Sequence, residues 1–131
     1  MITHTVNGAR ARVVTWLVIG VVVAVSFIDA GSIVLTRMRV DDDLKSAGFA
    51  GATAIQGQKV SGQAAQAAYA AATRDLNEGE EVDPKTFAVR PDGGVTLTVR
   101  MTAPTLMFKH LGFLDDFVNV EDTYDQPRIG Y

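Results

Sequence analysis

The sequence predicts an α+β protein: a single N-terminal transmembrane helix extended into a long helix, then an Ala-rich second helix packed on a three-stranded antiparallel sheet. Three observations lead to this prediction. An uncharged apolar run lies near the N-terminus, an alanine-rich stretch with helical spacing follows it, and the last part of the chain alternates apolar and polar residues. With 131 residues, the chain is long enough for one domain and not for a second core of normal size.

The apolar run is long enough to cross a membrane. Residues 13–28 carry no charge, and after Asp29 the apolar character continues to Leu35. A bilayer core needs roughly 20 residues of helix. A cleaved signal peptide would have a shorter core and small residues at the cleavage point, and a buried helix would have a polar face. We therefore expect residues 13–35 to be an uncleaved transmembrane helix.

The charges beside this helix bear on its orientation. Arg10 and Arg12 precede it, and Arg37 and Arg39 follow it, so the positive-inside count is balanced. The short tail and the large C-terminal part favour a cytoplasmic N-terminus. We expect residues 1–12 to be a short cytoplasmic tail of a single-pass cell-membrane protein, with the C-terminal domain extracellular or periplasmic.

Residues 36–77 have the spacing of two helices. Apolar and small residues recur every three or four positions from Val40 to Ile55, and no proline interrupts the chain between Leu35 and Glu81. The membrane helix is therefore expected to continue towards Gln56. Glycines at 57 and 62 indicate a break, after which Ser61 is placed to cap a second helix. Its expected apolar stripe consists of Ala65, Tyr69, Ala72 and Leu76.

The alanine and glycine residues of these helices favour close helix packing. A face of small side chains buries little area but lets another backbone approach. This packing can lie within one molecule, as a helical hairpin, or between molecules, and the sequence leaves both open. In the second case the candidate contacts to a partner are Gly48, Gly51 and Ala52.

Residues 78–131 are predicted to form an antiparallel β segment with a frayed C-terminus. Residues 95–102 alternate without a fault, so the residues at 95, 97, 99 and 101 face a core and those at 96, 98, 100 and 102 face water. Residues 86–90 precede this strand through a turn containing Asp92-Gly93-Gly94, which is typical of a hairpin. Residues 105–114 are expected to form a loop or short helical turn, and residues 117–124 a third strand.

The sequence offers little chemistry. No catalytic or phosphate-binding motif is present, and the two histidines, His4 and His110, fall on opposite sides of the expected membrane. The acidic runs at 41–43 and 78–83 lack the spacing of a calcium loop and are expected to be solvated surface. The chain has no cysteine, and its net charge of −3 does not favour nucleic-acid binding. We predict no enzymatic activity, cofactor, metal or small-molecule substrate.

Asp29 is the one residue of the apolar run that needs an explanation. A carboxylate in hydrocarbon is costly and often marks function. Asp29 can reach the headgroups or accept hydrogen bonds from Ser26 or Ser32. Alternatively, it pairs with a cation on a neighbouring subunit, which makes it the fourth candidate for partner contact.

Several segments together resemble a known family. The residues at 29–31 (Asp-Ala-Gly), 37–40 (Arg-Met-Arg-Val), 43–44 (Asp-Leu) and 47–52 (Ala-Gly-Phe-Ala-Gly-Ala) are similar to the opening of TadE/TadG-like proteins of the tight-adherence (Flp) pilus assembly system. The later segments 64–76, 86–102 and 117–124 match the Ala-rich helix and β segment of that family. The resemblance implies a pilin-like layout and a pseudopilin-like role in the bacterial cell envelope, without catalytic residues.

Three functions therefore remain open. The first is a non-enzymatic, membrane-anchored subunit of a pilus-assembly or envelope secretion machine, acting by helix packing and by docking of its exterior domain. Its expected partners are the lipid bilayer and other membrane subunits of the same machine. The second is a single-span accessory subunit of another membrane complex, respiratory or transport. The third, which no polar constellation supports, is a small anchored enzyme or binding protein.

Overall fold

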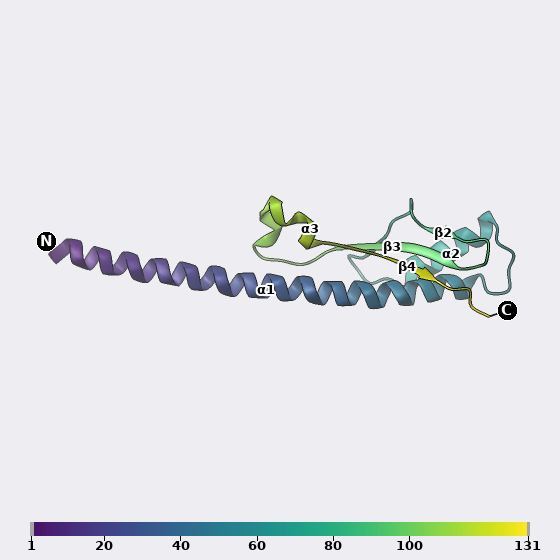
Figure 1. Cartoon of the computed structure of the whole chain (residues 1–131), viewed down its shortest axis with the longest axis horizontal. Helices are drawn as coiled ribbons and strands as arrows, with labels where there is room; N and C mark the ends of the chain where they lie inside the picture. The colour runs from purple at the N-terminus through teal and green to yellow at the C-terminus, as the bar shows by residue number, and fades with distance from the viewer. Residues whose placement is uncertain (1, 131) are drawn as a thin grey trace.

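The computed structural model describes residues 2–130, with side chains described from Gly8 onward. Its dominant element is α1 (Ile2–Ala54), an unbroken helix of 53 residues that extends about 80 Å (Figure 1). The predicted continuation of the apolar run into a long helix is thus confirmed, since α1 ends two residues before Gln56. Within the described residues, α1 is the one helix long and apolar enough to cross a membrane.

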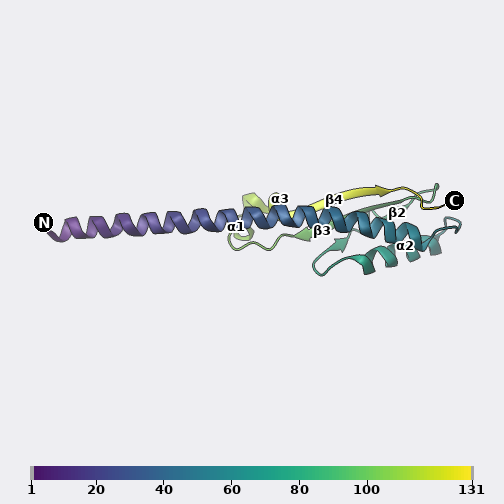
Figure 2. The ribbon, with the colours of Figure 1, turned by 90° about the horizontal axis from the view of Figure 1, so that it is seen from below.

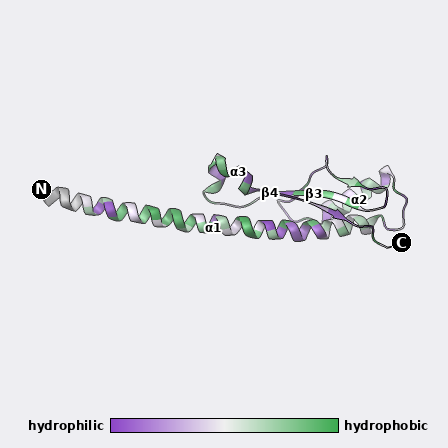
Figure 3. Ribbon diagram, viewed as in Figure 1, coloured by the Kyte–Doolittle hydropathy of each residue, from purple (hydrophilic) through white to green (hydrophobic). Residues whose placement is uncertain are grey.

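The two halves of α1 have different surroundings. From Val13 to Val23 its large apolar side chains are exposed, and this stretch is the hydrophobic run seen in Figure 3. From Asp29 onward one face of the helix is covered by the rest of the chain, and Val40 and Leu44 are almost wholly buried. One helix therefore presents an uncovered apolar half and supplies a core element of the folded domain.

The second helix, α2 (Gly62–Asp75), begins where the sequence predicts. The side chain of Ser61 accepts a hydrogen bond from the Ala64 N–H at 3.1 Å, which is the predicted N-cap. Gly57 adopts a φ of +75° in the turn that reverses the chain after α1. The buried stripe of α2 is Ala64, Ala68 and Ala72, so the predicted stripe is wrong by one position at its start. Tyr69 and Leu76 of that predicted stripe are partly buried at the edge of the core.

The sheet has four antiparallel strands, and the prediction of three is wrong. The central strand β3 (Val95–Thr102) has the predicted bounds and pairs along its whole length with β4 (Asn119–Gln126). Its other edge is shared end to end by two short strands, β1 (Glu81–Val82) and β2 (Ala88–Val89). The sequence missed β1 because a two-residue strand has no measurable alternation.

The last strand also differs from its prediction. The segment 117–124 begins with the end of a one-turn helix, α3 (Asp115–Val118), so β4 starts two residues later than expected and extends to Gln126. Between β3 and α3 lie two short 3₁₀ helices, η1 (Phe108–His110) and η2 (Gly112–Leu114), which confirm the predicted helical turns. In the C-terminal tail, which has no regular secondary structure from Pro127 to Gly130, Ile129 is partly buried against the core.

The domain has two layers, with α1 and α2 side by side against one face of the sheet (Figure 2). The core consists of the covered face of α1, the alanines of α2 and Val95, Leu97 and Val99 of β3. The helix that covers the long strands β3 and β4 is α1, whereas α2 contacts the short strands β1 and β2. The expectation that α2 is the main cover is therefore corrected, because α1 continues past its apolar run.

One residue of β3 departs from simple alternation. Thr98, expected to face water, is only 2% exposed, and its hydroxyl lies 2.7 Å from that of Thr123 on β4. The two hydroxyls form a cross-strand pair joined by one hydrogen bond. Alternation places Thr98 on the face away from the helices, but the position is buried there.

Candidate functional site

The carboxylate of Asp29 binds three consecutive backbone N–H groups from a distant loop. Leu106 N–H donates to Oδ1 at 2.7 Å, and the N–H groups of Met107 and Phe108 donate to Oδ2 at 2.8 and 2.9 Å. These donors lie at the start of η1, which has no side-chain cap of its own. Asp29 thus does what an N-cap does for a helix start, but from the middle of α1.

Neighbouring residues of α1 extend this junction by one to two turns. The Ser32 hydroxyl donates a short hydrogen bond to the carbonyl of Pro104. Ile33 and Thr36, further along the helix, are also buried. A second bond within the loop, from the Lys109 N–H to the Thr105 hydroxyl at 3.0 Å, holds the first turn of η1. The loop is therefore fixed at a defined position along the axis of α1, beside Asp29 and Ser32.

Neither of the two intramolecular partners predicted for Asp29 is its partner here. Ser26 donates to the Val22 carbonyl at 2.7 Å, one turn back on α1, and Ser32 binds Pro104. The carboxylate itself is 0% exposed and is occupied by the loop, so the pairing with a neighbouring subunit's cation is replaced by a contact within the chain. The sequence marked Asp29 as exceptional but gave no signal for residues 106–108, because backbone N–H groups have no sequence signature.

The other three candidate contacts also lie inside the chain. A Cβ added at Gly48 would lie 3.1–3.2 Å from atoms of Leu97, Tyr124 and Gln126, and one added at Gly51 would lie 3.1 Å from the Ala68 carbonyl oxygen. Ala52 is 1% exposed. The small-residue block therefore lets α1 approach the sheet and α2, which answers the question of intramolecular or intermolecular packing for these residues in favour of the former.

The segment around the Asp29 junction exposes large apolar side chains. We call residues 104–118 the foot segment; it contains η1, η2 and α3 and lies at the end of the domain nearest the uncovered half of α1 (Figure 1). Its Leu106, Phe113 and Phe117 are 62%, 79% and 54% exposed. Between this segment and α1 is an open apolar groove lined by Ala30, Ile33, Val34, Arg37, Phe108, Leu114 and Phe117.

A buried acidic group lies between α1 and the turn after α2. Glu80 is 8% exposed; its Oε1 accepts from the Asn77 backbone N–H at 3.1 Å, and the Asn77 side-chain amide donates to Asp43 at 2.8 Å. Within the described residues, Glu80 Oε2 is the one buried side-chain oxygen without a partner. Burial first, and the neighbouring Asp43 carboxyl second, raise the pKa of Glu80 from 4.5 to about 7.

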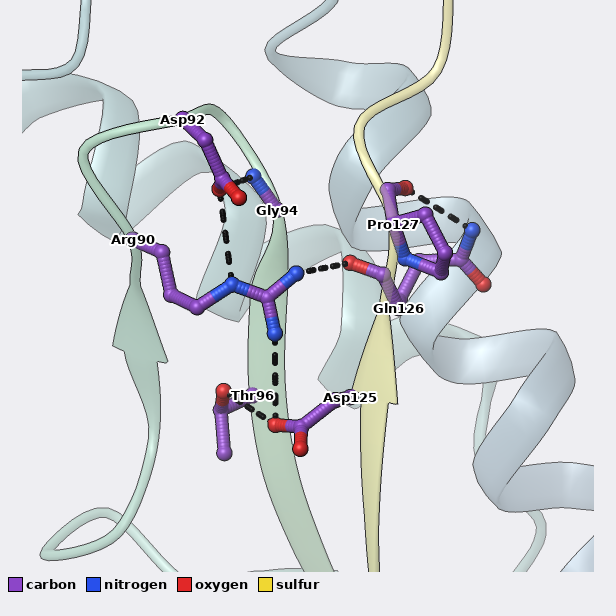
Figure 4. A network of polar contacts seen from close by, with 7 residues as sticks. All are labelled: Arg90, Asp92, Gly94, Thr96, Asp125, Gln126 and Pro127. Carbon is purple, nitrogen blue, oxygen red and sulfur yellow. Dashed lines mark hydrogen bonds and ion pairs between the residues drawn. The ribbon is translucent and has the colours of Figure 1, made fainter.

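A polar network holds the opposite end of the sheet together (Figure 4). The Arg90 guanidinium lies 3.4 Å from Asp92 and 3.3 Å from Asp125, and donates to the Gln126 carbonyl at 3.2 Å. Asp92 also accepts from the Gly94 N–H at 2.8 Å, and this bond lowers the pKa of the Asp92 carboxyl. These exposed contacts fix the β2–β3 turn against β4 and present no group arranged for chemistry.

The remaining polar candidates stand apart from one another. His110 is exposed at the end of η1, and the side chain of His4 lies outside the described residues. The acidic run 41–43 is on α1, where Asp41 forms an ion pair with Lys45 at 3.2 Å and Asp43 faces Asn77. Throughout residues 8–130, no three histidine or carboxylate side chains converge as they would to hold a metal ion.

No family model matches the chain, no curated protein matches it, and no solved structure matches it.

Proposed function

We propose that the protein is a single-pass, membrane-anchored structural subunit. The observation that carries this proposal is the continuity of α1, which leads from an uncovered apolar stretch directly into the core of the domain. A helix with large apolar side chains exposed from Val13 to Val23 is unfavourable in water and suits hydrocarbon. No flexible linker separates the two parts, so the domain is held rigidly with respect to its anchor.

The rigid connection supports a mechanical rather than a catalytic role. The domain is joined to α1 by the continuous helix and also, through the Asp29 and Ser32 bonds, at a second point closer to the membrane. A force on the domain therefore passes to the membrane helix without a hinge. We propose residues 13–35 as the span, residues 1–12 as the cytoplasmic tail and the domain as the extracellular or periplasmic part.

The resemblance to TadE/TadG-like proteins makes a pilus-assembly or envelope secretion machine the proposed setting. The proposed pilin-like layout has a long helix whose far half is covered by a small antiparallel sheet, as α1, β3 and β4 are arranged here. Docking would involve the bilayer, other membrane subunits and the exterior face of the domain. The competing proposal, an accessory subunit of a respiratory or transport complex, shares the anchor and differs only in its partners.

The topology can be tested directly because the chain has no cysteine. Ala9→Cys and Gln58→Cys place single thiols on the two sides of the proposed span, both at exposed positions. We expect a membrane-impermeant maleimide to label position 58 on intact cells and position 9 only after lysis. Labelling of position 9 alone would reverse the orientation, and labelling of both would contradict a single span.

The partners require a second experiment, with the full chain extracted in mild detergent. A photo-crosslinking residue at the exposed Phe49 reports on neighbours of the domain, and one at Val22 reports on neighbours of the span. Crosslinks to polytopic assembly proteins of a secretion machine would support the pilus proposal. Crosslinks to a respiratory or transport complex would favour the competing one, and crosslinks to lipid alone would contradict a subunit role.

A further inference from the structure

We propose that the foot segment docks on the outer surface of the membrane and inserts Leu106, Phe113 and Phe117 among the lipids. This inference rests on the proposed function, because it needs α1 to span the bilayer. It adds a second point of membrane contact, through which the domain lies directly on the lipid surface.

The first argument is the position along α1, relative to the membrane, at which the foot segment is held. Asp29 follows Val13 by 16 residues, which is about 24 Å of helix in a hydrocarbon core about 30 Å thick. The three N–H bonds to Asp29 and the Ser32 bond hold residues 104–108 beside this part of α1. If α1 enters the membrane near Val13, Asp29 lies about 6 Å inside the outer boundary of the hydrocarbon, so the foot segment bound to it reaches into that boundary.

The second argument is the kind of side chain exposed at that position. Phe113 is the most exposed large apolar side chain of the described residues, and it lies on η2 at the end of the domain that faces the anchor. Leu106 and Phe117 are exposed in the same segment, and the apolar groove against Ala30 and Val34 is continuous with the apolar face of α1. Such side chains are unfavourable in water and favourable at the boundary of headgroups and acyl chains.

The third argument is the satisfied backbone of the foot segment. Irregular backbone is costly near hydrocarbon unless its polar groups have partners. Here the N–H groups of Leu106, Met107 and Phe108 are bound by Asp29, that of Lys109 by the Thr105 hydroxyl, and those of His110, Leu111 and Leu114 by carbonyls within the segment. The loop can therefore approach lipid with few unpaired donors, and Asp29 acquires a role: its carboxylate satisfies a loop at the membrane surface.

The charges identify apolar insertion as the main attraction. The foot segment carries Lys109 against Asp115 and Asp116, so it has no positive excess for anionic headgroups. Docking should accordingly depend little on anionic lipid or on salt, in contrast to binding through a polybasic patch.

The test uses single-cysteine variants of the full chain, each labelled with an environment-sensitive fluorophore and reconstituted at low density in phosphatidylcholine vesicles. Phe113→Cys probes the foot segment. Phe49→Cys is the matched control, since it replaces a phenylalanine that is 56% exposed on α1 but 20 residues beyond Asp29. Val22→Cys probes the middle of the span. Both phenylalanines are largely exposed, so their replacement leaves the core intact.

We expect lipids with a nitroxide near the headgroup to quench most of the fluorescence at position 113 and little at position 49. Iodide in the water should quench position 49 and spare 113, and adding anionic lipid should change neither result. A deep nitroxide should quench position 22. Quenching at 22 combined with iodide access at 113 would overturn the foot proposal while leaving the anchor in place. If the deep nitroxide does not quench position 22, the membrane anchor and the foot proposal are both overturned. If neither the headgroup nitroxide nor iodide quenches position 113, the exposed apolar side chains of the foot segment contact protein instead of lipid.

Discussion

Removing the Asp29 carboxylate should release the foot segment from α1. Each hydrogen bond from a neutral donor to a charged group contributes about 1.5–3 kcal/mol, and Asp29 accepts three at 2.7–2.9 Å. Part of this is regained, because the freed N–H groups can bind water and the buried charge is gone. We expect Asp29→Ala to weaken the docking of the foot segment by about 2–4 kcal/mol, which is roughly a 30- to 1000-fold change in the opening equilibrium.

Amide hydrogen exchange of the reconstituted full chain measures this change residue by residue. The amides of Leu106, Met107 and Phe108 should lose protection by that factor, while the amides of β3 stay protected. Asp29→Asn separates the two oxygens, since one oxygen can still accept from 107 and 108 while the new NH₂ group faces the Leu106 N–H. In this variant, position 106 should lose more protection than 107 and 108.

Ser26→Ala is the matched control, because the Ser26 hydroxyl binds only the Val22 carbonyl within α1. It should leave exchange of the foot segment unchanged. Wild-type exchange rates at 106–108 in Asp29→Ala would refute the assignment of Asp29 as the group that holds the loop.

Three further predictions concern the domain. Gly51→Ala should destabilise it by about 1–2 kcal/mol, because the clash with a backbone carbonyl 3.1 Å away exceeds the gain in helix propensity. The measurement is the loss of amide exchange protection in β3. Gly62→Ala, where the added Cβ has no atom within 4 Å, is the control and should keep that protection. Ser61→Ala should cost about 1 kcal/mol through loss of the α2 cap, measured as faster amide exchange in the first turn of α2; unchanged exchange would contradict the cap. The pKa of Glu80 is raised to about 7, so this carboxyl binds its proton more tightly in the folded state than in the unfolded state. Its stabilising contribution to the free energy of unfolding is therefore fully present below pH 4.5 and is lost as the pH rises through 7. Glu80→Gln should therefore match the wild type in urea unfolding at pH 4 and exceed it by about 1–2 kcal/mol at pH 8, and equal stability at both values would refute the raised pKa.

The elements predicted best are those specified by neighbouring residues. The bounds of β3 follow from alternation over 95–102, the start of α2 from Ser61, and the β2–β3 turn from Asp92-Gly93-Gly94, where Gly93 has a φ of +89°. Each depends on backbone preferences within a few residues. The offset in β4 arises where this local information is weak, since Phe117 and Val118 suit a strand but complete the turn of α3.

The candidate site was predicted only in part, for the same reason. Asp29 was recognisable because a carboxylate within an apolar run needs a partner. Its partners lie 77–79 residues later in the chain and are backbone groups, which no spacing rule brings to α1. The exposed foot segment could be read as apolar and irregular, but its position beside the uncovered half of α1 depends on that contact.

The apolar N-terminal helix and the Ala-rich, antiparallel β domain that follows it could be predicted from local patterns, because helix and strand periodicities and caps act over a few residues. The packing of the fold, by contrast, makes Gly48 and Gly51 face the chain's own sheet and second helix, pairs Thr98 with Thr123, and places the foot segment on Asp29. These outcomes depend on which surfaces meet when α1 packs along the sheet. Small residues and a buried carboxylate permit close contact, but only the packed fold determines what they contact.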